Sequence, residues 1–141
     1  MSLRIQMLQV ARRGAGVLGD SRELVSGFLK SRLNSLGAGC NRVGDPDIYY
    51  TIFALAGLQA LGEPIFEEGL RQWLEGFGAG EELDLVHLGA LVRCWAAVGG
   101  VPETRKIAMA RELEKYRSND GMYDSEIHGN QGNAYGCFVV L

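Results

Sequence analysis

The segment at positions 47–62 constrains the fold of this chain more than any other. It reads Asp-Ile-Tyr-Tyr-Thr-Ile-Phe-Ala-Leu-Ala-Gly-Leu-Gln-Ala-Leu-Gly and carries no charge after Asp47. The aspartate can accept hydrogen bonds from free backbone N–H groups at the start of a helix, and Gly62 can end the helix. Because apolar residues occupy its whole circumference, the segment predicts a helix that is buried on every side.

The rest of the chain also predicts helices, since apolar residues recur at helical spacing and no segment shows clear two-residue alternation. A first helix is expected at 3–13 and a second mostly apolar helix at 83–98. Amphipathic outer helices are expected at 21–33, 66–77 and 103–117. The fold class is therefore predicted to be all-α.

Specific side chains are expected to be buried or to cap these helices. Asp20 and Ser21 are the predicted caps of the helix at 21–33, and Trp73 and Trp95 are expected in the core or an interface. The predicted apolar faces of the first two helices comprise Met7, Leu8, Val10, Ala11, Leu24, Val25, Phe28, Leu29 and Leu33.

The plan of an outer helix followed by an apolar helix repeats along the chain. Ala54-Leu55 and Ala90-Leu91 are 36 positions apart, and Pro64 and Pro102 are 38 positions apart. A period near this length indicates stacked helical hairpins, each covering the apolar face of its neighbour. We expect one repeat domain across residues 1–141.

The last predicted helix, at 132–141, is shorter than the helix at 47–61 and ends within an apolar run. The expectation is that Leu141 is not a solvent-facing end. Either a second subunit of a homo-oligomer covers this helix or the parent protein continues as a longer chain.

Composition excludes several function classes. The net charge of −3 and the sequence pI near 5.4 give no basic stripe for nucleic acid. The longest uncharged run, at 48–62, is too short for a transmembrane segment, which needs about 20 residues. Three widely spaced cysteines and no recognisable signal peptide predict free thiols in a reducing, cytoplasmic compartment.

Several motifs resemble the prenyltransferase and squalene-oxidase repeat family. Asp47-Ile48-Tyr49-Tyr50-Thr51 with Leu61-Gly62 is similar to the family's inner helix. Two segments resemble the loop that precedes an inner helix in that family. The first is Asn119-Asp120-Gly121-Met122-Tyr123, and the second, Leu36-Gly37-Ala38-Gly39-Cys40, resembles a degenerate copy of the loop. The resemblance implies an α/α toroid of inner and outer helices around an apolar cavity, of which this chain would form about half a ring.

The catalytic signatures of that family are incomplete in this sequence. The zinc-binding patterns place a cysteine or a histidine where Tyr49 and Tyr50 stand, and a phenol is a poor zinc ligand. The Asp-x-Asp-Asp acid of the cyclases is interrupted at Asp45-Pro46-Asp47-Ile48. We therefore assign no catalytic residue, metal or cofactor, and whether the chain is an enzyme stays open.

The candidate ligand-binding residues are Tyr50, His87 and Tyr135. In the repeat alignment they lie near the starts of three inner helices, where a polar rim above an apolar pocket would suit a lipid-like ligand. The alternative interpretation is aromatic packing between neighbouring helices.

A second constellation has metal-ligand residue types, namely Asp84, His87 and Cys94. Positions 84 and 94 are about 15 Å apart along one helix, so they cannot converge on an ion. We expect a capping aspartate, a partly buried histidine and a core cysteine. Asp124 and His128 are expected in a solvated loop.

Two functional hypotheses follow. The first is a prenyltransferase- or terpenoid-cyclase-like toroid protein that binds an isoprenoid or another apolar ligand. The second is a non-catalytic helical-repeat scaffold for protein interactions.

Overall fold

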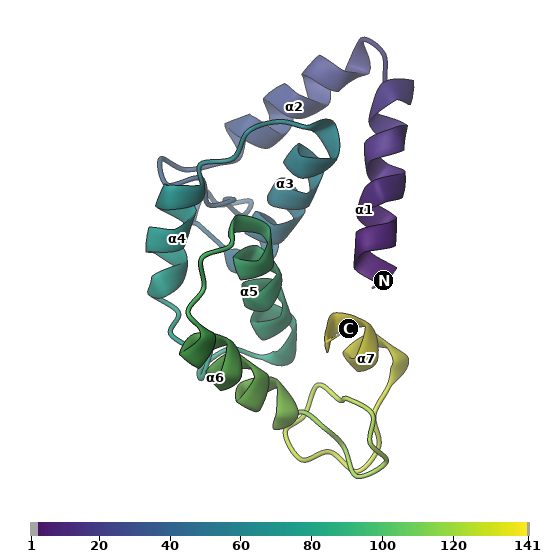
Figure 1. The fold of residues 1–141 in the computed structure, drawn as a ribbon, viewed down its shortest axis with the longest axis vertical. Helices are drawn as coiled ribbons and strands as arrows, with labels where there is room; N and C mark the ends of the chain where they lie inside the picture. The colour runs from purple at the N-terminus through teal and green to yellow at the C-terminus, as the bar shows by residue number, and fades with distance from the viewer. Residues whose placement is uncertain (1–2, 141) are drawn as a thin grey trace. The chain divides into compact units, whose positions relative to one another are not determined.

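A computed structural model describes residues 3–140, with side chains from Ile5 onward (Figure 1). The described residues contain seven α-helices and a short 3-10 turn, with isolated bridges as their only β-type pairing. The all-α prediction is confirmed. The chain divides into two compact units between Trp73 and Leu74, and whether they form one repeat domain stays a prediction.

The helices lie close to their predicted positions. The first unit contains α1 (Leu3–Gly14), the 3-10 turn η1 (Ala15–Val17), α2 (Ser21–Ser31) and α3 (Ile48–Leu61). Helix α4 (Glu67–Glu75) contains the boundary. The second unit contains α5 (Leu85–Val98), α6 (Glu103–Glu114) and α7 (Ala134–Val140).

Helix α3 is the core of the first unit and contacts both α1 and α2. Asp47 caps it by accepting hydrogen bonds from the Tyr49 and Tyr50 amides, and Gly62 ends it with a left-handed φ of 70°. The predicted cap and stop are therefore confirmed. The buried apolar residues of α3 are Ile48, Ile52, Ala54, Leu55, Leu58 and Leu61.

The prediction that α3 is buried on every side is wrong. Tyr49 and Tyr50 are 38% and 39% exposed, and Phe53 is 53% exposed. The Tyr49 and Phe53 rings pack edge to face with centroids 4.9 Å apart. Because α1 and α2 cover only part of the circumference, the aromatic residues of the first two turns remain at the surface.

Helix α2 also turns an unexpected face toward α3. Leu24 and Phe28 were predicted to be buried but are 75% and 64% exposed. The covered side instead includes Ser26, which is buried. On this side Leu29 approaches Gly57 so closely that a Cβ atom there would lie 2.7 Å from Leu29 Cδ1. A side chain at position 57 would therefore require Leu29 to move.

Two further predictions in this region are wrong. Asp20 makes no side-chain capping bond, because the Ser21 and Arg22 amides donate to the Leu18 and Gly19 carbonyls of the preceding turn. Of the residues expected on the buried face of α1, Met7 and Val10 are 53% and 68% exposed. Apart from η1, the principal described neighbour of α1 is α3. Most of the circumference of α1 therefore stays open.

Helix α5 forms the core of the second unit and contacts α6 and α7. Leu88, Leu91 and Cys94 are fully buried, and Trp95 is 2% exposed, as expected for a core residue. Gly89 allows α7 to pack closely against α5, since a Cβ atom at this position would lie 2.6 Å from Val139 Cγ1.

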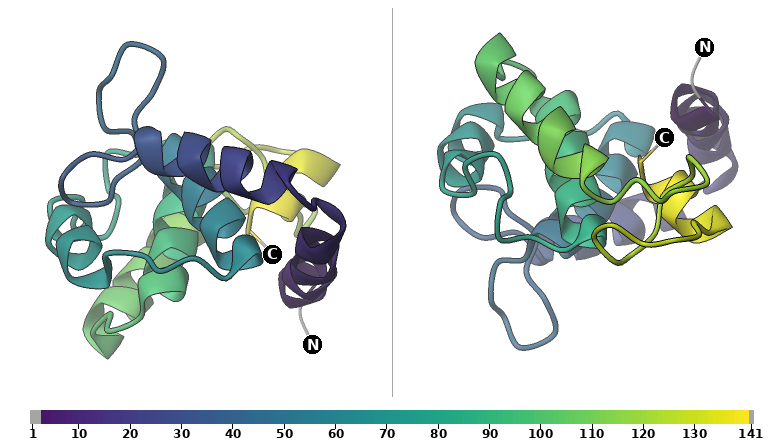
Figure 2. Two further views of the ribbon diagram at one scale, coloured as in Figure 1. Left: turned by 90° about the horizontal axis from the view of Figure 1, so that it is seen from above. Right: turned by 90° about the horizontal axis from the view of Figure 1, so that it is seen from below.

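The loops before α3 and α7 share one backbone hydrogen-bond pattern. Figure 2 shows in blue how part of the first loop projects from α2 and α3. Gly37 and Gly121 both have a φ of 83° and lie at equivalent positions. In the first loop the bonds run from Cys40 N to Arg32 O, Asn34 N to Ala38 O, Gly37 N to Asn34 O and Asp47 N to Gly39 O. In the second loop the equivalent bonds run, in the same order, from Asp124 N to Tyr116 O, Ser118 N to Met122 O, Gly121 N to Ser118 O and Asn133 N to Tyr123 O. The two loops are thus copies of one structural element, as their sequences suggested.

Candidate functional site

The three predicted ligand residues all lie in the first turn of a helix. Tyr50 and His87 are the third residues of α3 and α5, and Tyr135 is the second residue of α7. Each helix is preceded by a side chain that accepts a hydrogen bond from the amide three positions later: Asp47 from Tyr50, Asp84 from His87, and Asn133 from Gly136. Tyr50 and His87 are therefore equivalent, whereas Tyr135 is one position out of register.

His87 is tied to its capping aspartate through its ring as well as its amide. His87 Nδ1 lies 2.8 Å from Asp84 Oδ1, and the Asp84 carboxylate accepts the His87 amide at 2.9 Å. Partial burial acts to raise the pKa of Asp84, but these hydrogen bonds outweigh it and the pKa lies below its ordinary value. The contacts between Asp84 and His87 therefore stabilise the first turn of α5.

Tyr50 lines a groove in the first unit with a volume of about 500 Å³. Three elements form it: α2, the first turns of α3 and the loop that begins at Gly39. Apart from Tyr50, the lining residues are Phe28, Leu29, Arg32, Gly39, Cys40, Arg42, Phe53 and Ala54. Much of this lining is apolar, with a cysteine in the loop and two arginines.

The charged side chains of the groove are Arg32, at the C-cap of α2, and Arg42, in the loop. Arg32 donates a hydrogen bond of 2.6 Å to the Asn41 carbonyl oxygen, which holds its guanidinium against the loop. Arg42 is exposed. Thr51 fixes the loop against α3, because its buried hydroxyl accepts the Gly39 amide at 2.9 Å. The groove is therefore an apolar surface with a positively charged edge on a braced loop.

Sequence reasoning found only one residue of this groove. Phe28 was assigned to the buried face of α2, and Phe53 to a fully buried helix. Arg32 carried no motif, and Cys40 stood in the degenerate loop motif at 36–40 without being assigned to a site. The equivalence of the two loops is the sequence signal that could have placed residues 39–42 beside the start of α3, because Asn119 to Tyr123 precedes α7 in the same way.

His87 and Tyr135 belong to the second unit and do not line this groove. Tyr135 is 56% exposed, and the His87 side chain is 38% exposed. That Tyr50, His87 and Tyr135 share one rim stays a prediction.

The interpretation of Asp84, His87 and Cys94 as helix cap and core is confirmed. Asp84 is the N-cap of α5, His87 is partly buried, and Cys94 is fully buried. Burial raises the pKa of the Cys94 thiol to about 12, so it stays protonated near neutral pH. Within residues 3–140, no three His, Cys, Asp or Glu side chains are grouped so that they could hold a metal ion.

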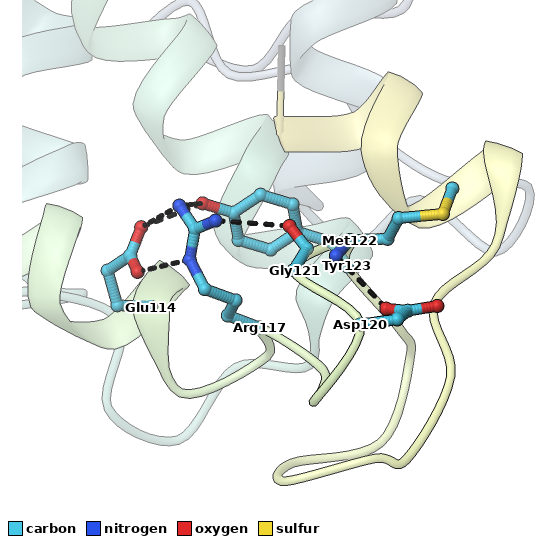
Figure 3. A network of polar contacts seen from close by, with 6 residues as sticks. All are labelled: Glu114, Arg117, Asp120, Gly121, Met122 and Tyr123. Carbon is cyan, nitrogen blue, oxygen red and sulfur yellow. Dashed lines mark hydrogen bonds and ion pairs between the residues drawn. The ribbon is translucent and has the colours of Figure 1, made fainter.

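Carboxylates at the end of α6 and in the loop before α7 accept hydrogen bonds from nearby residues of the same segment (Figure 3). Arg117 Nε donates to Glu114 at 2.7 Å, and the Tyr123 hydroxyl donates to the same carboxylate at 2.7 Å. The bonds from Arg117 and Tyr123 hold the pKa of Glu114 at about 2. Asp120 accepts hydrogen bonds from the Ser118 hydroxyl and the Met122 amide. These carboxylates brace the loop.

Asp124 and His128, expected in a solvated loop, lie in that same loop and are exposed or half-exposed. Asp124 accepts hydrogen bonds from the Ser125 amide and the Asn133 side chain, which ties it to the residue before α7. His128 adopts a φ of 60°, and its amide donates to the Lys115 carbonyl oxygen. Asp124 is therefore a structural member of the loop.

Neither a protein-family model, nor a curated protein sequence, nor a solved structure matches this chain significantly. None of the helices within residues 3–140 combines the length and the apolar composition needed to cross a membrane.

Proposed function

We propose that the protein binds an isoprenoid or another apolar chain in the groove of the first unit. The observation that carries this proposal is the presence of Phe28, Tyr50 and Phe53 on one groove of about 500 Å³. This volume lies within the range of about 300–1,000 Å³ typical of small-molecule pockets, which are mostly apolar with a few polar groups. The groove provides an apolar wall from two helices.

The resemblance to a toroid repeat supports the same proposal. An inner-type helix with its cap, and two copies of the loop that precedes such a helix, are the features that the two share. The proposal includes no reaction, because none of the described residues that line the groove is a nucleophile with a neighbouring base. Cys40 Sγ makes a weak contact of 3.9 Å with the Ala38 carbonyl oxygen.

Farnesol, a neutral isoprenoid, is a suitable first probe. Calorimetric titration of the whole chain is expected to give saturable binding that Phe53→Asp weakens at least tenfold. Leu24→Asp is the matched control, since Leu24 is also exposed but does not line the groove. Absence of binding, or equal effects of the two substitutions, would contradict the proposal.

Cys40 offers a second readout without any substitution. Farnesol in the groove should slow alkylation of Cys40, which lines it, while Cys137 in the second unit keeps its rate. Both cysteines have intermediate exposure, so each serves as a reference for the other. Equal protection of both would indicate a general effect of farnesol on the chain.

The second candidate function is a non-catalytic scaffold for another protein. Leu24 and Phe28 lie one helical turn apart on α2, and both are exposed. This apolar stripe continues beyond the groove, as a docking face would. Absence of farnesol binding to the folded chain would favour this candidate.

A further inference from the structure

Two arginines line the groove of the first unit without a carboxylate partner. Arg32 stands at the C-cap of α2, and Arg42 lies in the loop before α3. Among the described residues neither arginine forms an ion pair, whereas Arg22 and Lys30 of α2 both pair with Glu63. The described lining of the groove contains no aspartate or glutamate. The groove therefore presents two positive charges that are available to a ligand.

The guanidinium of Arg32 is held in place and still has donors to offer. Its Nη2 donates to the Asn41 carbonyl oxygen at 2.6 Å, which uses one of the five N–H groups of a guanidinium. Arg42 is exposed, so a ligand from solvent can reach its charge. The paired N–H groups of a guanidinium match the oxygens of a carboxylate or a phosphate in both geometry and charge.

The acidic residues closest in sequence to the groove are engaged elsewhere or lie outside it. The Asp47 carboxylate caps α3 by accepting the Tyr49 and Tyr50 amides at 2.8 Å and 3.1 Å. Asp45 is exposed, and neither aspartate lines the groove. These two carboxylates therefore leave the positive charge of the groove unpaired.

The charged and the apolar residues lie at different ends of the groove. Phe28 on α2 lies one helical turn before Arg32 at its C-cap. Phe53 on α3 lies about one turn after Tyr50. Because the loop joins the end of α2 to the start of α3, both phenylalanines are farther along their helices from the loop that carries Arg42. The groove thus changes from positive to apolar along its length, which suits a ligand with a charged head and an apolar tail.

We propose that this groove selects an anionic amphiphile, namely an apolar chain that ends in a carboxylate or a phosphate. The inference rests on the proposed function, because the apolar chain occupies the same groove against Phe28 and Phe53. The head group accepts N–H groups from Arg32 and Arg42. Hydrogen bonds between charged groups are about twice as strong as those between neutral groups, so the charge of the head group raises the affinity.

Calorimetry on the whole chain tests this selectivity with decanoate, decyl phosphate and 1-decanol, which share one tail. At least one of the two anions should bind at least tenfold more tightly than 1-decanol, and their relative affinities identify the head group. Equal affinity of 1-decanol and both anions would overturn the inference and leave the proposed function standing. If none of the three probes binds, the inference is overturned, and binding of farnesol then decides whether the proposed function stands.

Substitution of the arginines locates the head group. Arg32→Met and Arg42→Met should each weaken the tighter anion at least fivefold, while 1-decanol keeps its affinity and so reports an intact groove. Arg32→Lys retains the charge without the paired N–H groups and should weaken the anion less than Arg32→Met. Arg13→Met is the matched control, since Arg13 is an exposed arginine of the same unit that does not line the groove.

Two results of these substitutions would overturn the inference. Unchanged anion affinity in both Arg32→Met and Arg42→Met would show that the head group binds elsewhere. An equal loss in Arg13→Met would show that the anion responds to the overall charge of the chain and not to this groove.

Discussion

Gly136 lies directly against the backbone of Tyr123. A Cβ atom on Gly136 would lie 2.3 Å from the Tyr123 carbonyl oxygen, which is closer than any such contact can be. In the first copy, the glycine at the close approach lies in the loop and not in the helix. A Cβ atom on Gly39 would lie 2.8 Å from Cα of Thr51. Each copy therefore allows the loop to approach the helix by one glycine, placed in the loop in one case and in the helix in the other.

Gly136→Ala should lower the free energy of unfolding by about 1–3 kcal/mol, because the new methyl group meets backbone rather than a mobile side chain. Gly27→Ala is the control, since a Cβ atom there meets nothing within 4 Å in the interior of α2. It should stabilise by about 0.5–1 kcal/mol through helix propensity. Urea unfolding followed by circular dichroism measures both, and a neutral Gly136→Ala would contradict the close approach.

Asp47→Ala should destabilise the protein by about 1 kcal/mol, because the Tyr49 and Tyr50 amides lose their acceptor. Asp20→Ala should change stability very little, since Asp20 makes no capping bond. Thermal unfolding compares the two variants. A larger loss for Asp20→Ala than for Asp47→Ala would indicate that the turn carbonyls before α2 do not satisfy its amides.

Glu114 should make the loop before α7 sensitive to acid. Its folded pKa of about 2 lies below the ordinary value of 4.5, so its contribution is fully present above pH 4.5 and is lost as the pH falls through about 2. Carboxyl chemical shifts followed by NMR between pH 6 and 1.5 should give this midpoint. Arg117→Met should return the midpoint toward 4.5, and an unchanged midpoint would contradict the pairing.

The three cysteines should differ in reactivity. Cys94 is fully buried with a pKa of about 12, whereas Cys40 and Cys137 have intermediate exposure. Iodoacetamide at pH 8 should modify Cys40 and Cys137 and leave Cys94 intact until a denaturant is added. Mass spectrometry of the digested protein measures each site. Rapid labelling of Cys94 in the folded chain would show that α5 is not packed as described.

The candidate groove illustrates how far the sequence could lead. Tyr50 was identifiable because it follows a capping aspartate at the start of an apolar helix. Phe28 was assigned to the wrong face of α2. Apolar spacing on α2 favours Leu24 and Phe28 as the packed side. That spacing does not predict that Ser26 is buried, or that Gly57 of α3 leaves room for Leu29 beside it.

The sequence by itself determined the all-α class, the positions of the helices, the cap and stop of α3 and the relationship between the two loops. These features depend on local interactions, namely helical periodicity, a carboxylate beside free amides and glycines with positive φ. The tertiary structure decided which face of each helix is covered, where the groove lies and that the guanidinium of Arg105 packs over the Trp95 ring. Such features depend on contacts between segments far apart in the chain, where a single glycine or an uncovered turn changes which side chains meet.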